Sequence, residues 1–110
     1  MIKFIACDLD GTLLNSSKEL PRDLRATVER LNKIGVTFAP ASGRQYYKVL
    51  EQFEPISRNF MYIAENGAFV IKDGEVIVRD CLSGAVALDV IKRTRKLPSV
   101  CLLYTSPSPR

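Results

Sequence analysis

A pair of aspartates just after a short apolar segment constrains the fold and chemistry of this chain more than any other feature. Residues 2–7 are mostly apolar and predict a buried strand, and residues 8–14 read Asp-Leu-Asp-Gly-Thr-Leu-Leu, whose glycine predicts a loop. Side chains of a strand repeat their direction every second residue, so Asp8 and Asp10 can start from the same side of the backbone. Two crowded carboxylates need a metal ion or a shared proton between them. The pattern favours phosphoryl transfer, with one Asp as nucleophile, the other as proton carrier and Mg²⁺ offsetting the negative charge.

Strands and helices are predicted to alternate in the first part of the chain. Two further strands are expected at residues 36–39 and 61–64, and two helices at about residues 21–34 and 45–53. This alternation predicts an α/β fold, in which right-handed crossovers build a parallel sheet with helices on its faces. The first helix is expected to bury an apolar stripe made of Leu24, Val28, Leu31 and Ile34.

The pattern changes after the third predicted strand. Residues 68–72 and 75–79 flank the dipeptide Asp73-Gly74, which is a strong signal for a β-hairpin with a two-residue turn. Ser83 is expected to cap a helix that runs to about Lys96. The apolar side of that helix would consist of Val86, Val90 and Ile91.

Length and composition indicate one small globular domain, since the chain has 110 residues, of which 46% are hydrophobic and 25% charged. No apolar segment approaches the ~20 residues of a membrane span and no signal peptide is recognisable, so a cytoplasmic protein without a membrane partner is expected. The chain has three cysteines without a paired spacing, and no histidine. A disulfide framework, a zinc site and a histidine-based active site are therefore not expected, which leaves acid–base work to carboxylates.

The net charge of +4 does not indicate a nucleic-acid partner, because the excess is local. Residues 92–110 carry five basic and no acidic side chains, so the first 91 residues have a net charge of −1, five less than the whole chain. No aromatic residue is interleaved with the basic residues 92–96. These charges are therefore expected to form a solvated helix end, where cations suit the helix dipole.

A second group of candidate residues follows the second predicted strand. Ser42, Gly43 and Arg44 lie where that strand ends, and in such sheets ligands bind beyond the carboxyl ends of the strands. The Ser42 hydroxyl could donate to a phosphoryl oxygen, helped by backbone N–H groups at the start of the next helix. Alternatively Ser42 only caps that helix, and Arg44 either helps to bind phosphate or lies on the surface.

These residues together resemble the haloacid dehalogenase-like (HAD) hydrolases, and in particular the Cof-type phosphatases. Residues 8–14 are similar to the first motif of the family, and Ser42 falls where its second motif has Ser or Thr. The segment Glu65-Asn66-Gly67-Ala68 is also similar to Cof-type proteins, although by itself it predicts only an Asn-Gly turn. The resemblance implies a Rossmann-like, parallel, three-layer core, incomplete here, with the start of an α+β cap.

The resemblance further implies a Mg²⁺-dependent phosphatase of small phosphorylated metabolites that works through an aspartyl-phosphate. Asp8 would attack phosphorus, and Asp10 would protonate the leaving oxygen and then deprotonate water. The Asp8 carboxylate and the Asp10 backbone carbonyl would bind Mg²⁺. The other residues that would contact the substrate or shape the loop around its phosphate are Gly11, Thr12, Ser42, Gly43, Arg44 and Asn66.

The match to the family pattern is partial, because the chain has two of its four motifs. No Lys motif and no Gly-Asp…Asn-Asp segment is found after Ser42. The resemblance implies core at residues 1–80 and the beginning of a cap at 81–98, with 99–110 expected to be a non-native or disordered tail. We therefore expect an N-terminal fragment with little activity of its own. The alternatives are a phosphomutase of the same superfamily and a non-catalytic fragment, and neither substrate nor oligomeric state is predicted.

Overall fold

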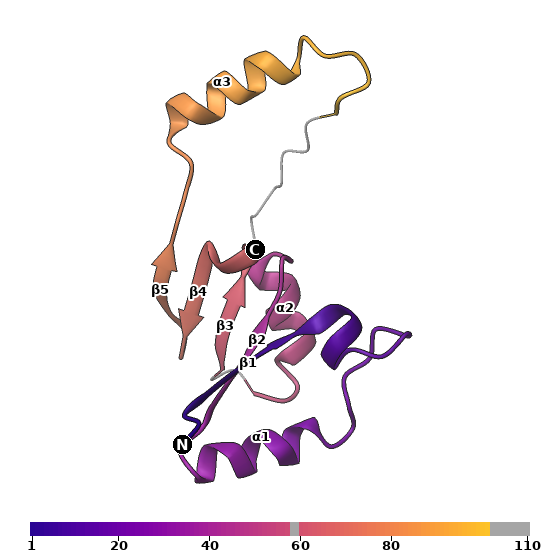
Figure 1. Cartoon of the computed structure of the whole chain (residues 1–110), viewed down its shortest axis with the longest axis vertical. Coiled ribbons are helices and arrows are strands. Elements are labelled where there is room, and N and C mark those ends of the chain that lie inside the picture. The colour runs from indigo at the N-terminus through magenta and orange to yellow at the C-terminus, as the bar shows by residue number, and fades with distance from the viewer. Residues whose placement is uncertain (58–59, 102–110) are drawn as a thin grey trace. The chain divides into compact units, whose positions relative to one another are not determined.

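The structure is a computed structural model that describes residues 1–57 and 60–101 (Figure 1). The chain divides into two compact units, Met1–Asp80 and Cys81–Arg110. No described helix is both long enough and apolar enough to cross a membrane.

The first unit is built on one sheet, whose strands follow the chain order β1-β2-β3-β4-β5 (Figure 1). Three strands are parallel: β1 (Phe4–Asp8), β2 (Thr37–Ala41) and β3 (Met61–Ala64). The sheet continues in antiparallel pairing through β4 (Phe69–Lys72) and β5 (Glu75–Arg79). The predicted parallel α/β core and the predicted hairpin are thus both confirmed, with strand bounds close to those expected.

The register of the parallel strands brings their carboxyl ends level with one another. Asp8, the last residue of β1, lies opposite Ala41, the last residue of β2. Ala41 in turn lies opposite Ile63 of β3. The segments that follow these three strands therefore meet at one edge of the sheet, as ligand-binding segments of such sheets do.

The helices α1 (Leu24–Lys33) and α2 (Tyr46–Phe53) bury their apolar sides in one shared cluster against the sheet. Because both helices contribute to the same cluster, they cover the same face of the sheet. Phe53 and Tyr62 are among its largest fully buried side chains, and truncating such an aromatic to Ala costs ~3–5 kcal/mol. The buried members of the cluster are Leu9, Leu14, Leu24, Val28, Phe38, Val49, Phe53, Phe60 and Tyr62.

The stripe predicted for the first helix is confirmed at Leu24 and Val28, which are buried, but Ile34 is 69% exposed. Helix α1 ends at Lys33, so Ile34 follows the last turn and its side chain no longer keeps the helical spacing. A glycine with a positive φ of 74° follows at Gly35 and ends the helix as expected.

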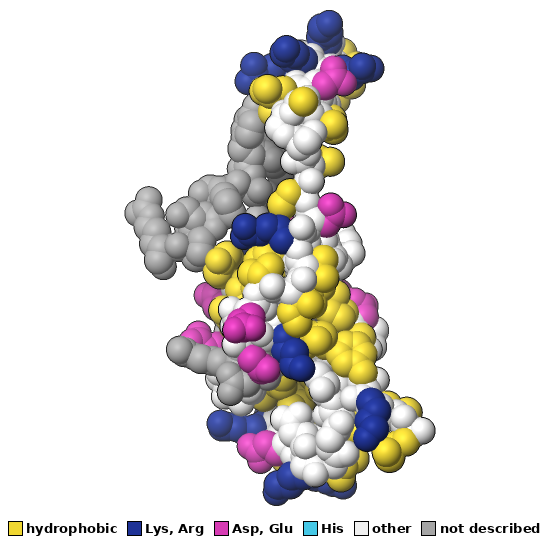
Figure 2. All heavy atoms as spheres, turned by 90° about the vertical axis from the view of Figure 1, so that its left-hand side faces the viewer, with side chains coloured by type: hydrophobic (Ala, Val, Ile, Leu, Met, Phe, Trp, Pro, Cys, Tyr) yellow, Lys and Arg dark blue, Asp and Glu magenta, His cyan; other side chains and the backbone are white. Residues whose placement is uncertain are grey.

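The antiparallel hairpin turns at Asp73-Gly74, where both residues have positive φ (50° and 82°). Such values fit a two-residue turn that matches the twist of its strands. Strand β5 is exposed along its whole length, including Val76, Ile77 and Val78. Figure 2 views the side of the molecule on which β5 lies, and apolar side chains are visible at this surface.

The second unit contains α3 (Gly84–Thr94). The predicted cap is confirmed, since the Ser83 hydroxyl accepts a hydrogen bond from the Val86 N–H at 3.3 Å. None of the residues of α3 is buried, and Val86 and Val90 are 48% and 43% exposed. Two of the three residues predicted for the apolar side of this helix are thus exposed, and the third, Ile91, is half-buried.

Candidate active site

A cleft of about 240 Å³ lies at the carboxyl ends of the parallel strands. It collects residues from the carboxyl ends of β1, β2 and β3 and from the segments that follow β2 and β3, which the register of the sheet brings together. Four of the residues predicted from the sequence line it: Asp8, Ser42, Gly43 and Asn66. The remaining lining residues are Ala41, Ile63 and Gly67.

Asp8 reaches the cleft because the chain turns sharply directly after it. Leu9 is fully buried and anchors the turn, whose residues Leu9–Leu13 close with a hydrogen bond from the Leu14 N–H to the Leu9 carbonyl at 2.9 Å. Gly11 has a φ of 76°, a left-handed conformation that favours glycine. Gly11 and Thr12 lie in this turn and are not among the residues that line the cleft.

The loops after β2 and β3 are joined by backbone hydrogen bonds. The Asn66 N–H donates to the Ser42 carbonyl at 3.2 Å, and the Glu65 N–H donates to the Arg44 carbonyl at 3.0 Å. Glu65, Asn66 and Gly67 all have positive φ (53°, 56° and 89°). Two non-glycine residues in this region are uncommon, and strained backbone of this kind concentrates at functional sites. The predicted Asn-Gly turn is thus part of the cleft wall.

Ser42 is not the cap of the following helix. The N-cap position of α2 is occupied by Gln45, which makes no side-chain cap hydrogen bond. The Ser42 hydroxyl instead accepts a hydrogen bond from the Arg44 N–H at 3.1 Å. Since a hydroxyl also has one proton to donate, that proton stays available to a ligand in the cleft.

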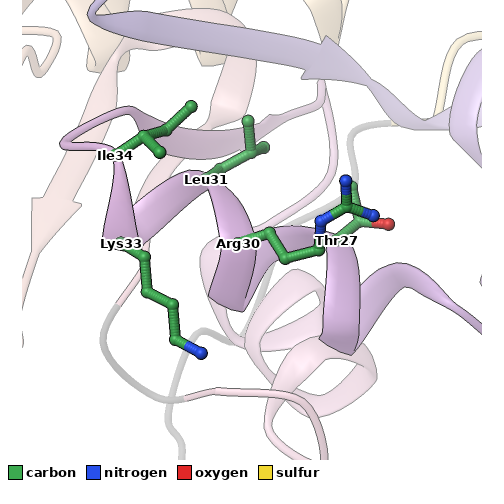
Figure 3. Close-up of a pocket in the computed structure, with 5 residues that line it drawn as sticks. All are labelled: Thr27, Arg30, Leu31, Lys33 and Ile34. Atoms are coloured by element: carbon green, nitrogen blue, oxygen red, sulfur yellow. The ribbon is translucent and has the colours of Figure 1, made fainter.

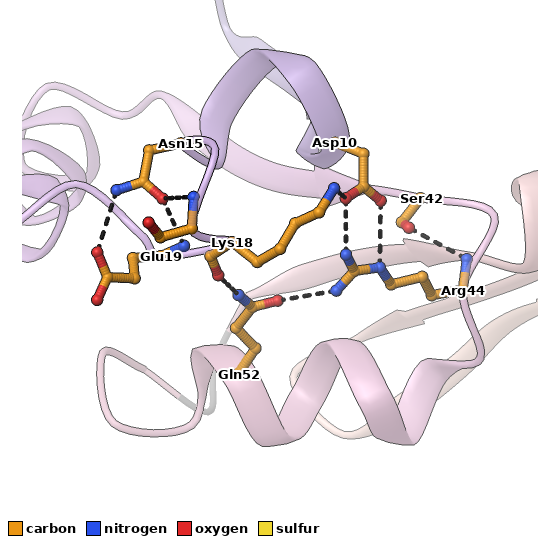
Figure 4. Close-up of polar contacts among 8 residues, drawn as sticks. Asp10, Asn15, Lys18, Glu19, Ser42, Arg44 and Gln52 are labelled. Carbon is orange, nitrogen blue, oxygen red and sulfur yellow. Dashed lines mark hydrogen bonds and ion pairs between the residues drawn. The ribbon is translucent and has the colours of Figure 1, made fainter.

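Asp10 does not line the cleft with Asp8, although the sequence pattern allowed both to start on one side. Strand β1 ends at Asp8, so the alternation of side chains stops before Asp10. The turn then gives the Asp10 carboxylate a different direction from that of Asp8. Three charge-assisted contacts hold the Asp10 carboxylate: Lys18 Nζ to Oδ1 at 2.8 Å, Arg44 Nη2 to Oδ1 at 2.7 Å, and Arg44 Nε to Oδ2 at 3.2 Å (Figure 4). The positive charge beside this acid therefore comes from two side chains.

The hydrogen bond from Lys18, and next to it those from Arg44, lower the pKa of Asp10 below its ordinary value. Arg44 is not among the residues that line the cleft, and its side chain is 33% exposed. Its guanidinium is instead shared between Asp10 and the side-chain oxygen of Gln52, which accepts from Nη1 at 3.2 Å.

Lys18 and Gln52 are residues of this site that the sequence did not reveal. The Gln52 amide also donates to the Lys18 carbonyl at 2.9 Å, which closes a network between the loop after β1, the loop after β2 and helix α2 (Figure 4). No local pattern marks either residue, because their roles depend on contacts between segments eight to 34 positions apart in the sequence.

A larger cavity, about 440 Å³, lies along α1 and is lined by Thr27, Arg30, Leu31, Lys33 and Ile34 (Figure 3). All five residues belong to α1 or follow it directly, and the chain then leads into the start of β2. This cavity is thus at the opposite end of the strands from Asp8 and contains none of the candidate site residues.

The donors at the carboxyl ends of the strands fit a magnesium ion that keeps part of its water shell. The Asp8 carboxylate faces the cleft and makes no hydrogen bond or ion pair with any described residue. No group of three or more acidic, Cys or His side chains converges on one point within residues 1–57 and 60–101. Magnesium sites commonly use only one or two protein carboxylates and retain several waters, so this donor set is compatible with Mg²⁺.

Comparison with known proteins identifies the family to which this site belongs. A family model of the haloacid dehalogenase-like hydrolases matches residues 5–107. The chain belongs to this family. The resemblance inferred from the motifs at Asp8 and Ser42 is therefore confirmed.

Two relatives of this HAD hydrolase are named as phosphatases. The 5-amino-6-(5-phospho-D-ribitylamino)uracil phosphatase YbjI of Escherichia coli K12 is 33% identical over 100 residues, which are 90% of this chain and 37% of that protein. The HMP-PP phosphatase of Cronobacter sakazakii is 32% identical over 92 residues, which are 83% of this chain and 34% of that protein.

The fold of this HAD hydrolase is similar to that of solved members. The crystal structure of TM0651 from Thermotoga maritima matches with a TM-score of 0.76 and 33% sequence identity, over 87% of this chain and 36% of that one. The Rossmann-like fold class is thereby confirmed. The chain spans about a third of the length of these three relatives.

Proposed function

We propose that this chain carries the nucleophile of a Mg²⁺-dependent phosphatase that acts on small phosphorylated metabolites in the cytoplasm. The observation that carries the proposal is the position of Asp8, an unpaired carboxylate in a cleft whose other polar groups are the Ser42 hydroxyl and the Asn66 amide. Donors of this type suit the oxygens of a phosphoryl group. The names of the two phosphatase relatives support the same reaction.

The reaction proceeds in two steps. The Asp8 carboxylate attacks phosphorus, the bond to the ester oxygen breaks, and Asp10 gives that leaving oxygen a proton. Water then attacks the aspartyl-phosphate, its proton passes to Asp10, and inorganic phosphate leaves as the Asp8 carboxylate is restored. The Ser42 hydroxyl and the Asn66 amide orient the phosphoryl group in both steps.

Asp10 must loosen at least one of its cation contacts in order to act as the acid. Lys18 and Arg44 stabilise its ionised form, which is the form that accepts the proton from water in the second step. Lys18 is the contact more readily exchanged, because its side chain is 61% exposed whereas that of Arg44 is 33% exposed.

The Asp8 carboxylate and the Asp10 backbone carbonyl would hold Mg²⁺. When bound, the ion offsets the negative charge that accumulates between the carboxylate and the phosphoryl oxygens.

Turnover by the chain is expected to be slow. No Lys or Arg is among the described residues that line the cleft, since the nearby cations are engaged by Asp10. Removing a single preorganised donor from an active site costs ~10²–10³ in rate. A phosphoryl group in this cleft has few such donors.

Hydrolysis of p-nitrophenyl phosphate, with and without Mg²⁺, tests the proposal. Slow, Mg²⁺-dependent release is expected from the chain, and Asp8→Asn should reduce it to the rate in buffer. Asp73→Asn is a matched control, because Asp73 lies in the hairpin turn with a φ of 50°, where Asn is well tolerated. Equal rates in both variants would contradict the proposed role of Asp8.

A further inference from the structure

We propose that Gln52 is a positioning residue for Asp10, acting by holding the guanidinium of Arg44 and the backbone of Lys18, the two residues whose cations contact the Asp10 carboxylate. The inference rests on the proposed function, because the role of Asp10 as proton carrier comes from it. The contacts that carry it join the ends of one amide side chain to Arg44 and to Lys18.

Arg44 is held at both edges of its guanidinium. Nε and Nη2 make the paired contact with the two oxygens of Asp10, and Nη1 donates to Oε1 of Gln52. A paired contact of this type fixes direction as well as distance. Because Gln52 also holds Nη1, the plane of the guanidinium is fixed. The paired contact then fixes the direction in which the Asp10 carboxylate faces.

Lys18 is held through its backbone in a tightly closed loop. The Asn15 side-chain oxygen accepts from the N–H groups of Ser17 and Glu19, both at 2.9 Å, and the Lys18 N–H donates to the Asn15 carbonyl at 3.0 Å. Lys18 itself has a φ of 61°. Gln52 Nε2 donates to the Lys18 carbonyl, which docks this loop on α2.

The side-chain amide of Gln52 acts as a hydrogen-bond acceptor at one atom and as a donor at the other. Its oxygen accepts from the Arg44 guanidinium, and its nitrogen donates to the Lys18 carbonyl (Figure 4). A carboxylate at this position would keep the first contact and lose the second, and a methionine would lose both. The position therefore requires an amide of this length.

These contacts are expected to govern geometry much more than stability. Asp10 and Lys18 are largely exposed, with side chains 45% and 61% accessible, and exposed ion pairs add little to folding. Gln52 is half-buried on the helix, like Gln45, whose side chain makes no cap hydrogen bond. Gln45→Met is thus a matched control for Gln52→Met.

The first readout is hydrogen exchange at the Arg44 Nε–H in ¹H–¹⁵N spectra, with the signal assigned by its loss in Arg44→Lys. We expect Gln52→Met to speed this exchange at least tenfold, Gln52→Glu to have an intermediate effect, and Gln45→Met to leave the rate unchanged. An Arg44 Nε–H in Gln52→Met that exchanges within twofold of the parent chain would overturn the inference.

The second readout is the hydrolysis of p-nitrophenyl phosphate. Gln52→Met is expected to lower kcat about tenfold with KM changed less than twofold, because Gln52 is not among the residues that line the cleft. An unchanged kcat together with faster exchange would overturn the positioning role. If the parent chain shows no hydrolysis at all, the proposed function fails, and the exchange measurement alone then decides whether Gln52 holds the Arg44 guanidinium.

Discussion

A Cβ atom on residue 43 would lie 2.9 Å from Oδ1 of Asn66, which is closer than side-chain carbons approach such atoms. The Asn66 amide therefore packs directly on the backbone of Gly43, and only glycine leaves room for it there. This contact joins the loop after β2 to the loop after β3 at the cleft that contains Asp8.

Gly43→Ala is expected to displace the Asn66 side chain and to weaken binding of phosphate or vanadate to the cleft about tenfold. The stability cost should be ~1–3 kcal/mol or less, since the clashing atom is the end of a side chain. Titration followed by ¹H–¹⁵N spectra and urea unfolding measure the two effects.

Gly84→Ala is the control for this substitution, because a Cβ at Gly84 meets nothing within 4 Å. It should leave anion binding unchanged. The double variant Gly43→Ala/Asn66→Gly removes the clash, so its urea midpoint should recover relative to Gly43→Ala. If Gly43→Ala binds phosphate as well as the parent chain, the Asn66 contact does not shape the cleft.

Asp10 should titrate below the ordinary carboxyl value of ~3.9. Lys18 is the main cause of its lowered pKa and Arg44 the second. Because the folded state favours the ionised form, the contribution of Asp10 to stability is present above the ordinary pKa and is lost as the pH falls below it. Carboxyl ¹³C spectra between pH 6 and 2 measure the midpoint directly.

Lys18→Met should move the Asp10 midpoint upward, whereas Lys48→Met should not, because Lys48 pairs with Glu51. A midpoint at the ordinary value in the parent chain would show that the ion pairs seen around Asp10 are not populated in solution.

Tyr62 should make the fold sensitive to alkali. Burial raises the pKa of Tyr62, and its hydroxyl donates to the Ser57 carbonyl at 3.0 Å. Since the folded state holds this proton more tightly than the unfolded chain, the stability that it adds is complete below pH ~10 and is lost as the pH rises above it. Urea unfolding from pH 7 to 11 should show this loss.

Tyr62→Phe should be less stable by ~0.5–1.5 kcal/mol at pH 7 because the hydrogen bond is absent, yet its stability should change less between pH 9 and 11. Tyr47→Phe is the control, since Tyr47 is exposed. If the free energy of unfolding changed with pH in the same way for the parent chain and Tyr62→Phe, the proposed role of the Tyr62 hydroxyl would be contradicted.

Strand β1 is expected to cause association at high concentration. It lies at the edge of the sheet. The carbonyl of Lys3, just before β1, accepts a hydrogen bond from the Thr37 N–H of β2, so the backbone N–H and carbonyl of Phe4, the next residue, point away from β2. Phe4 is 43% exposed, and an apolar strand edge without a partner is a template for pairing with another chain. Sedimentation velocity over a concentration series measures the association.

Phe4→Lys should reduce this association, whereas Ile34→Lys, which removes a more exposed apolar residue directly after α1, should not. A chain that stays monomeric at every concentration would contradict the prediction.

The sequence predicted those parts of the site that depend on where strands end. Asp8 ends a strand, and Ser42 and Asn66 each follow one. Parallel pairing alone brings the carboxyl ends of neighbouring strands together. Ser83 was likewise predictable as a cap, because a capping hydrogen bond reaches only three residues along the chain.

The surroundings of Asp10 were not predictable in this way. Its position depends on Lys18, Arg44 and Gln52, which lie in three other segments and meet only after the sheet and α2 have formed. The exposure of Ile34 was not predictable from periodicity either. The apolar spacing in the sequence includes Ile34, but the helix itself ends one residue earlier, at Lys33.

The role of Asp8 as nucleophile is tested most directly by mass spectrometry of the chain after incubation with Mg²⁺ and acetyl phosphate. We expect one phosphoryl group on the peptide that contains Asp8. It should be removable by hydroxylamine, absent in Asp8→Asn and more abundant in Asp10→Asn, in which water is not deprotonated. Phosphorylation that persists in Asp8→Asn, or none on the parent chain in the presence of Mg²⁺, would contradict the assignment of Asp8 as the nucleophile.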